Sequence, residues 1–294
     1  MKQRNFKQVD VFTATAYRGN PLAVVLDGSG LSDGEMQHFA RWTNLSETTF
    51  LLPPQDDAAD YRVRIFTPGG ELPFAGHPTL GSCHAWLEAG GKPRGREFIV
   101  QDCQAGLVKL RREPAPRAGD AARLGQTAQL AFAAPPLKQS APSPAVLAQV
   151  AAALGVQASQ VVAAQILDNG PAWFTLLLDS PQTVLKLSPD HMQLKSLGHK
   201  VGVAAIYPEG TEGPQLEVRA FAAAIGIIED PVTGSLNAGL AQWLIEQDRM
   251  PPRYLAAQGT CIDRAGRVHI QRDGAGQVWV GGDSVTCITG SVAL

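Results

Sequence analysis

Hydrophobic and polar residues alternate in two similar stretches, residues 61–66 and 216–221, which predicts a half-buried strand in each. Each strand is followed by a segment in which apolar residues recur at helical spacing, from Pro78 to Trp86 and from Pro231 to Trp243. A proline suits the first turn of a helix. Because few polar residues interrupt either segment, both helices should be apolar on most faces and therefore buried.

Other segments have the residue patterns of surface helices, of a linker and of a C-terminal tail. We predict surface helices over residues 33–42, 144–154 and 189–197. Residues 113–126 are rich in Pro, Arg, Ala and Gly and form the predicted linker. The tail, residues 277–294, exceeds what a second copy of the pattern needs, so part of it should return and pair with the first half.

An internal repeat underlies this pattern. Five pairs of segments resemble each other in the same order, and the first four pairs are separated by 150, 156, 155 and 153 residues. The pairs are Asn20-Pro21 with Gly170-Pro171, Leu31-Ser32 with Leu187-Ser188, 63–66 with 218–221, 77–82 with 230–235, and 106–110 with 266–270. Five ordered matches at nearly one spacing are unlikely to arise by chance.

The repeat predicts an α+β protein of two similar domains. Each half contains several strands and one largely apolar helix, which needs strands around it to be buried. We place the first domain at residues 1–118, joined by about 280–294, and the second at residues 119–279.

Composition and charge make several classes of protein function unlikely for this chain. Apolar residues make up 45% of the 294 residues and charged residues 18%, which argues against a disordered chain. The net charge of −2 and the absence of a basic cluster disfavour a nucleic-acid or anionic-membrane partner. The N-terminus lacks the apolar stretch of a signal peptide, and no run approaches the roughly 20 apolar residues of a membrane span. We therefore expect a cytoplasmic location.

Cysteine and histidine are dispersed along the chain. The four cysteines, Cys83, Cys103, Cys261 and Cys287, form no CxxC pair, and the six histidines form no metal-binding motif. We expect all four cysteines to pack as small buried hydrophobic residues, and we expect no metal.

The starts of the two apolar helices are the first candidates for chemistry. His77 and Asp230 occupy the same position in the repeat, each directly before a proline. Helix N-termini carry unpaired N–H groups and partial positive charge, so two of them facing one cleft would hold a carboxylate. The alternatives are that Asp230 only caps its helix and that His77 is a hydrogen-bonded turn residue.

Glu47 is the third candidate. It precedes the apolar residues 50–52, and its counterpart in the repeat falls near Val203, so the glutamate is specific to the first copy. Apolar neighbours make a carboxyl group harder to ionise, as a general base near neutral pH requires. The alternative is an ordinary exposed glutamate at the end of a strand.

Several motifs together resemble the PhzF family of phenazine-biosynthesis isomerases over essentially the whole chain. They are Gly19-Asn-Pro-Leu-Ala-Val-Val25, Leu45-Ser-Glu-Thr48, Phe66-Thr-Pro68, Phe74-Ala-Gly-His-Pro-Thr-Leu-Gly81 and Glu229-Asp-Pro-Val-Thr-Gly-Ser235. The resemblance implies a diaminopimelate-epimerase-like fold, with two pseudo-symmetric domains that each wrap a β-barrel-like sheet around a central helix. It also implies a homodimer.

The resemblance also implies roles for individual residues. Glu47 matches the family's proton-shuttling glutamate, and His77 and Asp230 match residues that bind or polarise the substrate. Gly76 and Gly234 would offer backbone N–H groups to the substrate. We also assign Ser235 and Ser46, the neighbour of Glu47, to the substrate-binding residues. A departure, Gly69-Gly70 before Glu71, puts the substrate contacts of that loop in doubt.

The absence of cysteine from both helix entrances bears on the mechanism. Related epimerases and proline racemases use one cysteine at each entrance, whereas residues 74–78 and 229–234 contain none. A single carboxylate base is therefore the leading hypothesis, in a cofactor-free isomerase acting on a small unsaturated or cyclic carboxylic acid such as dihydro-3-hydroxyanthranilate. The alternatives are an amino-acid epimerase on the same scaffold and a non-catalytic protein that binds small carboxylates.

Overall fold

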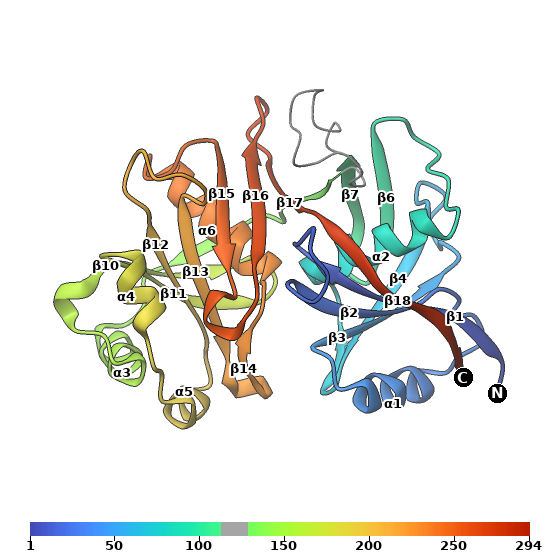
Figure 1. Ribbon diagram of the computed structural model, residues 1–294, viewed down its shortest axis with the longest axis horizontal. Coiled ribbons are helices and arrows are strands. Elements are labelled where there is room, and N and C mark those ends of the chain that lie inside the picture. The colour runs from blue at the N-terminus through green and yellow to red at the C-terminus, as the bar shows by residue number, and fades with distance from the viewer. Residues whose placement is uncertain (113–128) are drawn as a thin grey trace. The chain divides into compact units, whose positions relative to one another are not determined.

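The computed structural model describes residues 1–112 and 129–294 (Figure 1). The chain forms two compact units: Met1–Ala133 together with Gly281–Leu294, and Ala134–Val280. The predicted linker, residues 113–126, and the predicted boundary after residue 118 lie outside the described residues.

The first unit is a sheet wrapped around helix α2. Its strands pair in the order β8–β7–β6–β4–β3–β2–β1–β18, with the short β5 added to β4. Helix α2 contacts β1, β2, β3, β4, β8 and β18, and helix α1 packs on β3 and β4. The elements are β1 (Gln3–Val11), β2 (Asn20–Val25), α1 (Asp33–Thr43), β3 (Glu47–Leu52), β4 (Tyr61–Thr67), β5 (Gly70–Leu72), α2 (Gly76–Glu88), β6 (Phe98–Cys103), β7 (Gly106–Arg112), β8 (Leu130–Ala133) and β18 (Ser284–Ala293).

The second unit repeats this plan around helix α6. Its strands pair in the order β9–β10–β11–β12–β13–β15–β16, with β14 added to β13. The elements are β9 (Lys138–Ser140), α3 (Pro144–Leu154), η2 (Ala158–Gln160), β10 (Val161–Asp168), β11 (Ala172–Leu178), α4 (Pro181–Lys186), α5 (His191–Leu197), β12 (Lys200–Ile206), β13 (Leu216–Ala222), η3 (Ala223–Ile225), β14 (Ile227–Asp230), α6 (Gly234–Glu246), β15 (Arg253–Gln258), η4 (Thr260–Ile262) and β16 (Gly266–Arg272). Strand β17 (Val278–Gly282) includes the last residues of this unit and the first two residues of the C-terminal segment of the first unit.

Strand directions confirm the internal repeat. The neighbours β2 and β3 are parallel, as are β11 and β12, and β4 runs parallel to β6 as β13 does to β15. Each unit is therefore a mixed sheet around one buried helix, which confirms the predicted α+β fold.

Most of the predicted elements are present. Strands β4 and β13 cover the two alternating stretches, and α3 spans the predicted residues 144–154. Helix α1 extends one residue beyond the prediction, and α5 begins two residues later than predicted. The C-terminal tail returns to the first unit as predicted, because β18 pairs antiparallel with β1.

The two central helices are buried as their apolar sequences predict. Every residue from Gly76 to Ala85 of α2 is buried. Gly81 allows the helix to lie close to the sheet, since a Cβ atom there would be 2.7 Å from Leu22 Cδ2 and 2.8 Å from Val11 Cγ2. A larger residue at this position would push the helix away from β1 and β2.

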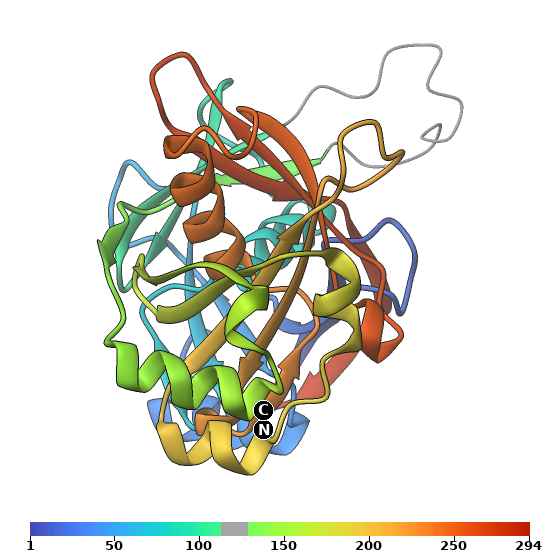
Figure 2. The same ribbon diagram turned by 90° about the vertical axis from the view of Figure 1, so that its left-hand side faces the viewer.

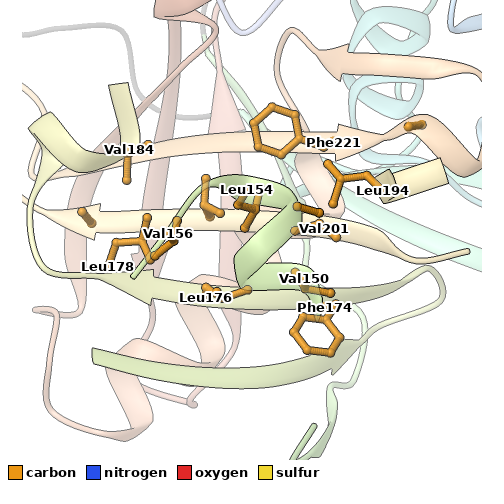
Figure 3. Packing of buried hydrophobic residues seen from close by; sticks show 14 residues of the cluster. Val150, Leu154, Val156, Phe174, Leu176, Leu178, Val184, Leu194, Val201 and Phe221 are labelled. Carbon is orange, nitrogen blue, oxygen red and sulfur yellow. The ribbon is translucent and has the colours of Figure 1, made fainter. Parts of the chain in front are cut away.

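A second apolar layer lies on the outer face of the second unit's sheet. Figure 2 shows α3, in green, and α5, in yellow, on the side turned to the viewer. Side chains of these helices and of α4 pack against β11, β12 and β13 (Figure 3). The buried cluster is Val150, Ala153, Leu154, Val156, Phe174, Leu176, Leu178, Val184, Leu194, Val201, Val203, Ala205, Phe221 and Ala223.

One ion pair recurs at the same place in both units. Arg64 of β4 forms two hydrogen bonds with Glu71 of β5, at 2.7 and 2.6 Å. Arg219 of β13 likewise pairs with Glu229 of β14, at 2.9 and 2.8 Å. Each guanidinium also lies 5.0 Å from a phenylalanine ring two residues further along its strand. The pairs therefore mark equivalent positions in the two repeats.

A buried histidine makes the stability of the first unit depend on pH. His84 Nε2 of α2 lies 3.0 Å from Thr286 Oγ1 and 3.3 Å from Glu88 Oε1. Burial lowers the pKa of His84 below its ordinary value of 6.5, although Glu88 acts in the opposite direction. The unfolded chain therefore binds the proton more readily than the folded chain between pH 6.5 and the lower folded pKa.

We expect the free energy of unfolding to fall as pH drops through this window, by at most about 1.4 kcal/mol per pH unit from this one group. His84→Gln removes the titrating ring and should weaken the pH dependence. Urea unfolding of both proteins at a series of pH values between about 7.5 and 5 measures it. Equal slopes in the two proteins would contradict the assignment to His84.

Candidate functional site

Helices α2 and α6 begin without a side-chain cap. The side chains of the N-cap residues, Ala75 and Thr233, accept no backbone N–H of the first turn, and neither first turn contains an acidic residue. The other four α-helices of the described chain are capped by the side chains of Ser32, Ser143, Ser180 and Asp190. Helix starts with no such cap and with partial positive charge suit an anionic ligand.

Glu47 is the first residue of β3. Strand β3 lies parallel to β2, where Glu47 pairs with Leu22, and antiparallel to β4. The following residues, Thr48 and Thr49, are fully buried, which holds the start of the strand in place. The Glu47 side chain itself is only 13% exposed. The structure therefore does not place it as an ordinary solvated glutamate.

His77 and Glu47 meet at the start of α2. His77 is the second residue of the helix, its side chain is 5% exposed, and its Nε2 lies 3.4 Å from Glu47 Oε2. Gly76, which is also buried, is the first residue of the same helix. The structure thus brings together two residues that are 30 positions apart in the sequence.

Asn20 holds the other side of the imidazole ring. Its Nδ2 lies 3.4 Å from His77 Nδ1, and Ser46 Oγ donates to Asn20 Oδ1 over 3.4 Å. An amide nitrogen can only donate, so this contact suits the tautomer of a neutral ring in which Nδ1 accepts and Nε2 carries the proton. Asn20 is fully buried. It was not among the predicted site residues, although it belongs to the quoted Gly19–Val25 motif.

In the second unit, Asp230 does not cap a helix. It is the last residue of β14, and α6 begins four residues later, at Gly234. The expectation that Pro231 opens the helix is therefore wrong, whereas Pro78 does lie in the first turn of α2. Asp230 Oδ2 accepts a hydrogen bond of 2.5 Å from the hydroxyl of Thr233. The pairing of β14 with β13, where Asp230 lies opposite Ala220, places this carboxylate.

Ser235 is the second residue of α6 and is held from two sides. Trp173 donates its indole N–H to Ser235 Oγ over 3.0 Å, and Asn169 Nδ2 donates to the Ser235 carbonyl over 2.8 Å. Asn169 is 6% exposed and Trp173 4% exposed. Gly234, the predicted backbone donor, is the buried first residue of the helix. Neither Trp173 nor Asn169 was predicted, because their role depends on a contact across more than 60 residues of sequence.

The strand register corrects the internal alignment at the site. Counted from the two arginine–glutamate pairs, the helix start at Gly76 corresponds to the one at Gly234, so the counterpart of His77 is Ser235 and not Asp230. The connection carrying η3 makes the second repeat three residues longer here, since Glu229 follows Arg219 by ten positions and Glu71 follows Arg64 by seven. The sequence did contain a signal for the correct alignment, because the pattern Glu-x-Pro-x-x-Gly occurs at residues 71–76 and again at residues 229–234.

The counterpart of Glu47 is also corrected. Thr48 pairs with Phe66 in the first unit, and Val201 pairs with Phe221 in the second. The equivalent of Glu47 is therefore Lys200, not a residue near Val203. The glutamate is specific to the first repeat, as predicted, but a cation occupies its place in the second.

Glycines 69 and 70, whose presence put the substrate contacts of this loop in doubt, form a hydrogen-bonded turn. The amides of both glycines donate to Thr67 Oγ1 over 3.1 Å, and Gly70 begins β5. Glu71 is engaged with Arg64 rather than pointing to a substrate. This departure from the family pattern is a structural turn.

The cysteines divide into two groups. Cys83 and Cys103 are buried as predicted, but Cys287 is partly exposed and Cys261 is exposed, so the expectation of four buried thiols is wrong. Burial raises the pKa of the Cys83 thiol to about 12. Cys83 is the eighth residue of α2, so it does not lie at the helix entrance.

Two further findings concern ligands and membranes. Within residues 1–112 and 129–294, no group of three or more His, Cys, Asp or Glu side chains is arranged to hold a metal ion. No helix in the described part of the chain is long and apolar enough to span a membrane.

Comparison with solved structures defines the class of protein. A PhzF-family protein from Bacillus anthracis superposes with a TM-score of 0.83 at 23% identity, with all of both chains covered. A hydroxyproline epimerase from Agrobacterium vitis superposes with a TM-score of 0.65 at 16% identity, covering 99% of this chain and 93% of the other. The fold is that of the two-repeat, diaminopimelate-epimerase-like proteins.

Sequence comparison then gives the family. The PhzC-PhzF family, described as phenazine biosynthesis-like protein, matches residues 9–290. The relative "Antisense-enhancing sequence 1" of Schizosaccharomyces pombe is 38% identical, with 99% of each chain covered. Trans-2,3-dihydro-3-hydroxyanthranilate isomerase of Pseudomonas aeruginosa is 33% identical, covering 92% of this chain and 90% of the relative. The chain belongs to the PhzC-PhzF family and is an isomerase of the PhzF type.

Proposed function

We propose that this protein is a cofactor-independent isomerase that moves a proton within a small unsaturated or cyclic carboxylic acid, with Glu47 as its single base and acid. The observation that carries the proposal is the 3.4 Å approach of His77 Nε2 to Glu47 Oε2 at the uncapped start of α2. The name of the Pseudomonas aeruginosa relative supports a substrate similar to dihydro-3-hydroxyanthranilate.

The proposed reaction conserves all atoms of the substrate. Glu47 removes a proton from a carbon activated by conjugation, and the electron pair of the broken C–H bond enters the π system. The protonated Glu47 then delivers a proton to another carbon on the same face, which regenerates the carboxylate. His77, with its proton on Nε2, orients the Glu47 carboxylate toward the substrate.

Other residues in the proposal bind the substrate. In the first unit, the start of α2 supplies the backbone N–H of Gly76 for a carboxylate, with Ser46 as a further binding group. In the second unit, the start of α6 supplies the N–H of Gly234 in the same way, and Asp230 and Ser235 are proposed as binding groups there. The buried thiol of Cys83 is a poor base because burial disfavours the thiolate. This supports a carboxylate base rather than a pair of thiols.

Solvent deuterium tests the proposal. We expect the protein to convert trans-2,3-dihydro-3-hydroxyanthranilate in deuterated water, with label at the carbon that receives the proton. Dialysis against a chelator should leave the rate unchanged. Label at the α-carbon of an amino acid, with inversion, would instead identify an epimerase. Binding of the acid by calorimetry with no label in any carbon would identify a binding protein.

A further inference from the structure

We propose that Gln258 is a positioning residue that holds the carboxylate of Asp230 through the hydroxyl of Thr233. The inference rests on the proposed function, in which Asp230 orients the substrate. Gln258 is the last residue of β15, is fully buried, and was not among the predicted site residues.

Both ends of the Gln258 amide are engaged at the entrance of α6. Its Nε2 donates to Thr233 Oγ1 over 2.9 Å and to the Asp230 carbonyl over 3.0 Å. Its Oε1 accepts the Thr233 backbone N–H over 3.0 Å and the side-chain amide of Asn237 over 2.9 Å. One side chain thus connects the end of β14, the N-cap of α6 and the first turns of that helix.

The chemistry of these groups sets the direction of the hydrogen bonds. The Gln258 amide nitrogen can only donate, so Thr233 Oγ1 accepts from it and has one hydrogen left to give. That hydrogen goes to Asp230 Oδ2, over 2.5 Å. A donor of this kind stabilises the ionised carboxylate and restricts its rotation.

The first repeat shows that the fold does not need this chain of hydrogen bonds. The register of β6 on β4 and of β15 on β13 makes Cys103 the counterpart of Gln258. Counted from the helix starts, Ala75 is the counterpart of Thr233 and Leu72 that of Asp230. The same architecture therefore forms in the first unit without any of the three polar groups, which points to a role in the site.

Removing the Thr233 hydroxyl tests the inference. Thr233→Val keeps the shape but loses the donor, and we expect kcat/KM to fall about 10- to 100-fold. The Asp230 carboxyl should take up its proton about one pH unit higher, because the carboxylate loses a hydrogen bond. Thr233→Ser retains the hydroxyl and should stay within about threefold of the wild type.

Gln258→Met, of similar volume, should shift the titration of Asp230 in the same direction. The Asp230 titration in the double variant Thr233→Val/Gln258→Met should shift no further than in Thr233→Val alone, because Gln258 reaches this carboxylate through the Thr233 hydroxyl. Gln101→Met is the matched control, since Gln101 is also fully buried and bonds Thr79 and Tyr61 within the first unit. It should lower stability and leave the titration of Asp230 in place.

A readout independent of turnover separates this inference from the proposed function. Carbon-13 NMR of labelled aspartate follows the titration of the Asp230 carboxyl, whose midpoint should move up by about one pH unit in Thr233→Val and not in Thr233→Ser. An inactive wild type with this shift would refute the proposed function but not the Gln258 contact. An unshifted Asp230 resonance in folded Thr233→Val and Gln258→Met, or additive shifts of that resonance in the double variant, would overturn the inference.

Discussion

Glu47→Gln is expected to abolish turnover while the protein still binds its carboxylic acid. The amide keeps the size of the side chain and can remain beside His77, but it cannot accept a proton from carbon. General-base contributions are about 10²–10⁴-fold, and a sole proton shuttle should lie at or beyond the upper end of that range. Deuterium incorporation measures turnover, and titration calorimetry with the same acid measures binding.

Two cysteine variants are controls for this experiment. Cys83→Ala removes the buried thiol of α2, and Cys261→Ala removes the exposed thiol of η4. Both should keep activity within a few-fold, whereas His77→Ala and Asp230→Ala should weaken binding as well as turnover. If Glu47→Gln exchanged deuterium at the wild-type rate while Cys83→Ala did not, a thiol mechanism would replace the one proposed.

Arg219→Met is expected to cause the largest loss of stability among single changes at the repeated ion pairs. Arg219 and Glu229 are each 6% exposed, and the guanidinium also donates to the carbonyls of Val184 and Leu187. The substitution leaves Glu229 buried without its partner, which costs about 3–5 kcal/mol. The free energy of unfolding, from chemical denaturation monitored in the second unit, measures the loss.

Arg64→Met is the matched control at the equivalent position. Arg64 is 16% exposed and Glu71 27% exposed, so water compensates part of the broken pair. We expect a loss of about 1 kcal/mol, toward the range for accessible pairs. Equal losses in the two variants would show that burial does not decide the strength of these pairs.

The local pattern of residues determined much of the fold. The alternation in β4 and β13 and the apolar spacing of α2 and α6 depend on neighbours a few residues apart, and strands and buried helices are present there. Strand β13 is buried at every residue, so the expectation of a half-buried strand is wrong for it. The start of α3 has a similar local origin, because Ser143 caps the helix and Pro144 occupies its first turn.

Helix starts without such signals were harder to place. The α6 sequence offers Asp230 before a proline, a common capping pattern, yet β14 continues through Asp230 and the helix begins at Gly234. The pairing of β14 with β13 and the Arg219–Glu229 contact outweigh the local preference. Capping preferences are worth only about 1 kcal/mol, so interactions between distant segments can override them.

The sequence by itself determined the two-repeat α+β fold, the family resemblance and the identity of Glu47 and His77 as candidates. Only the tertiary structure decided which residues meet: His77 with Glu47 and Asn20, and Asp230 with Thr233 and Gln258. It also decided that Lys200 and Ser235 are the counterparts of Glu47 and His77. These relations follow from strand register and side-chain hydrogen bonds between segments far apart in the chain, which hydrophobic periodicity does not encode.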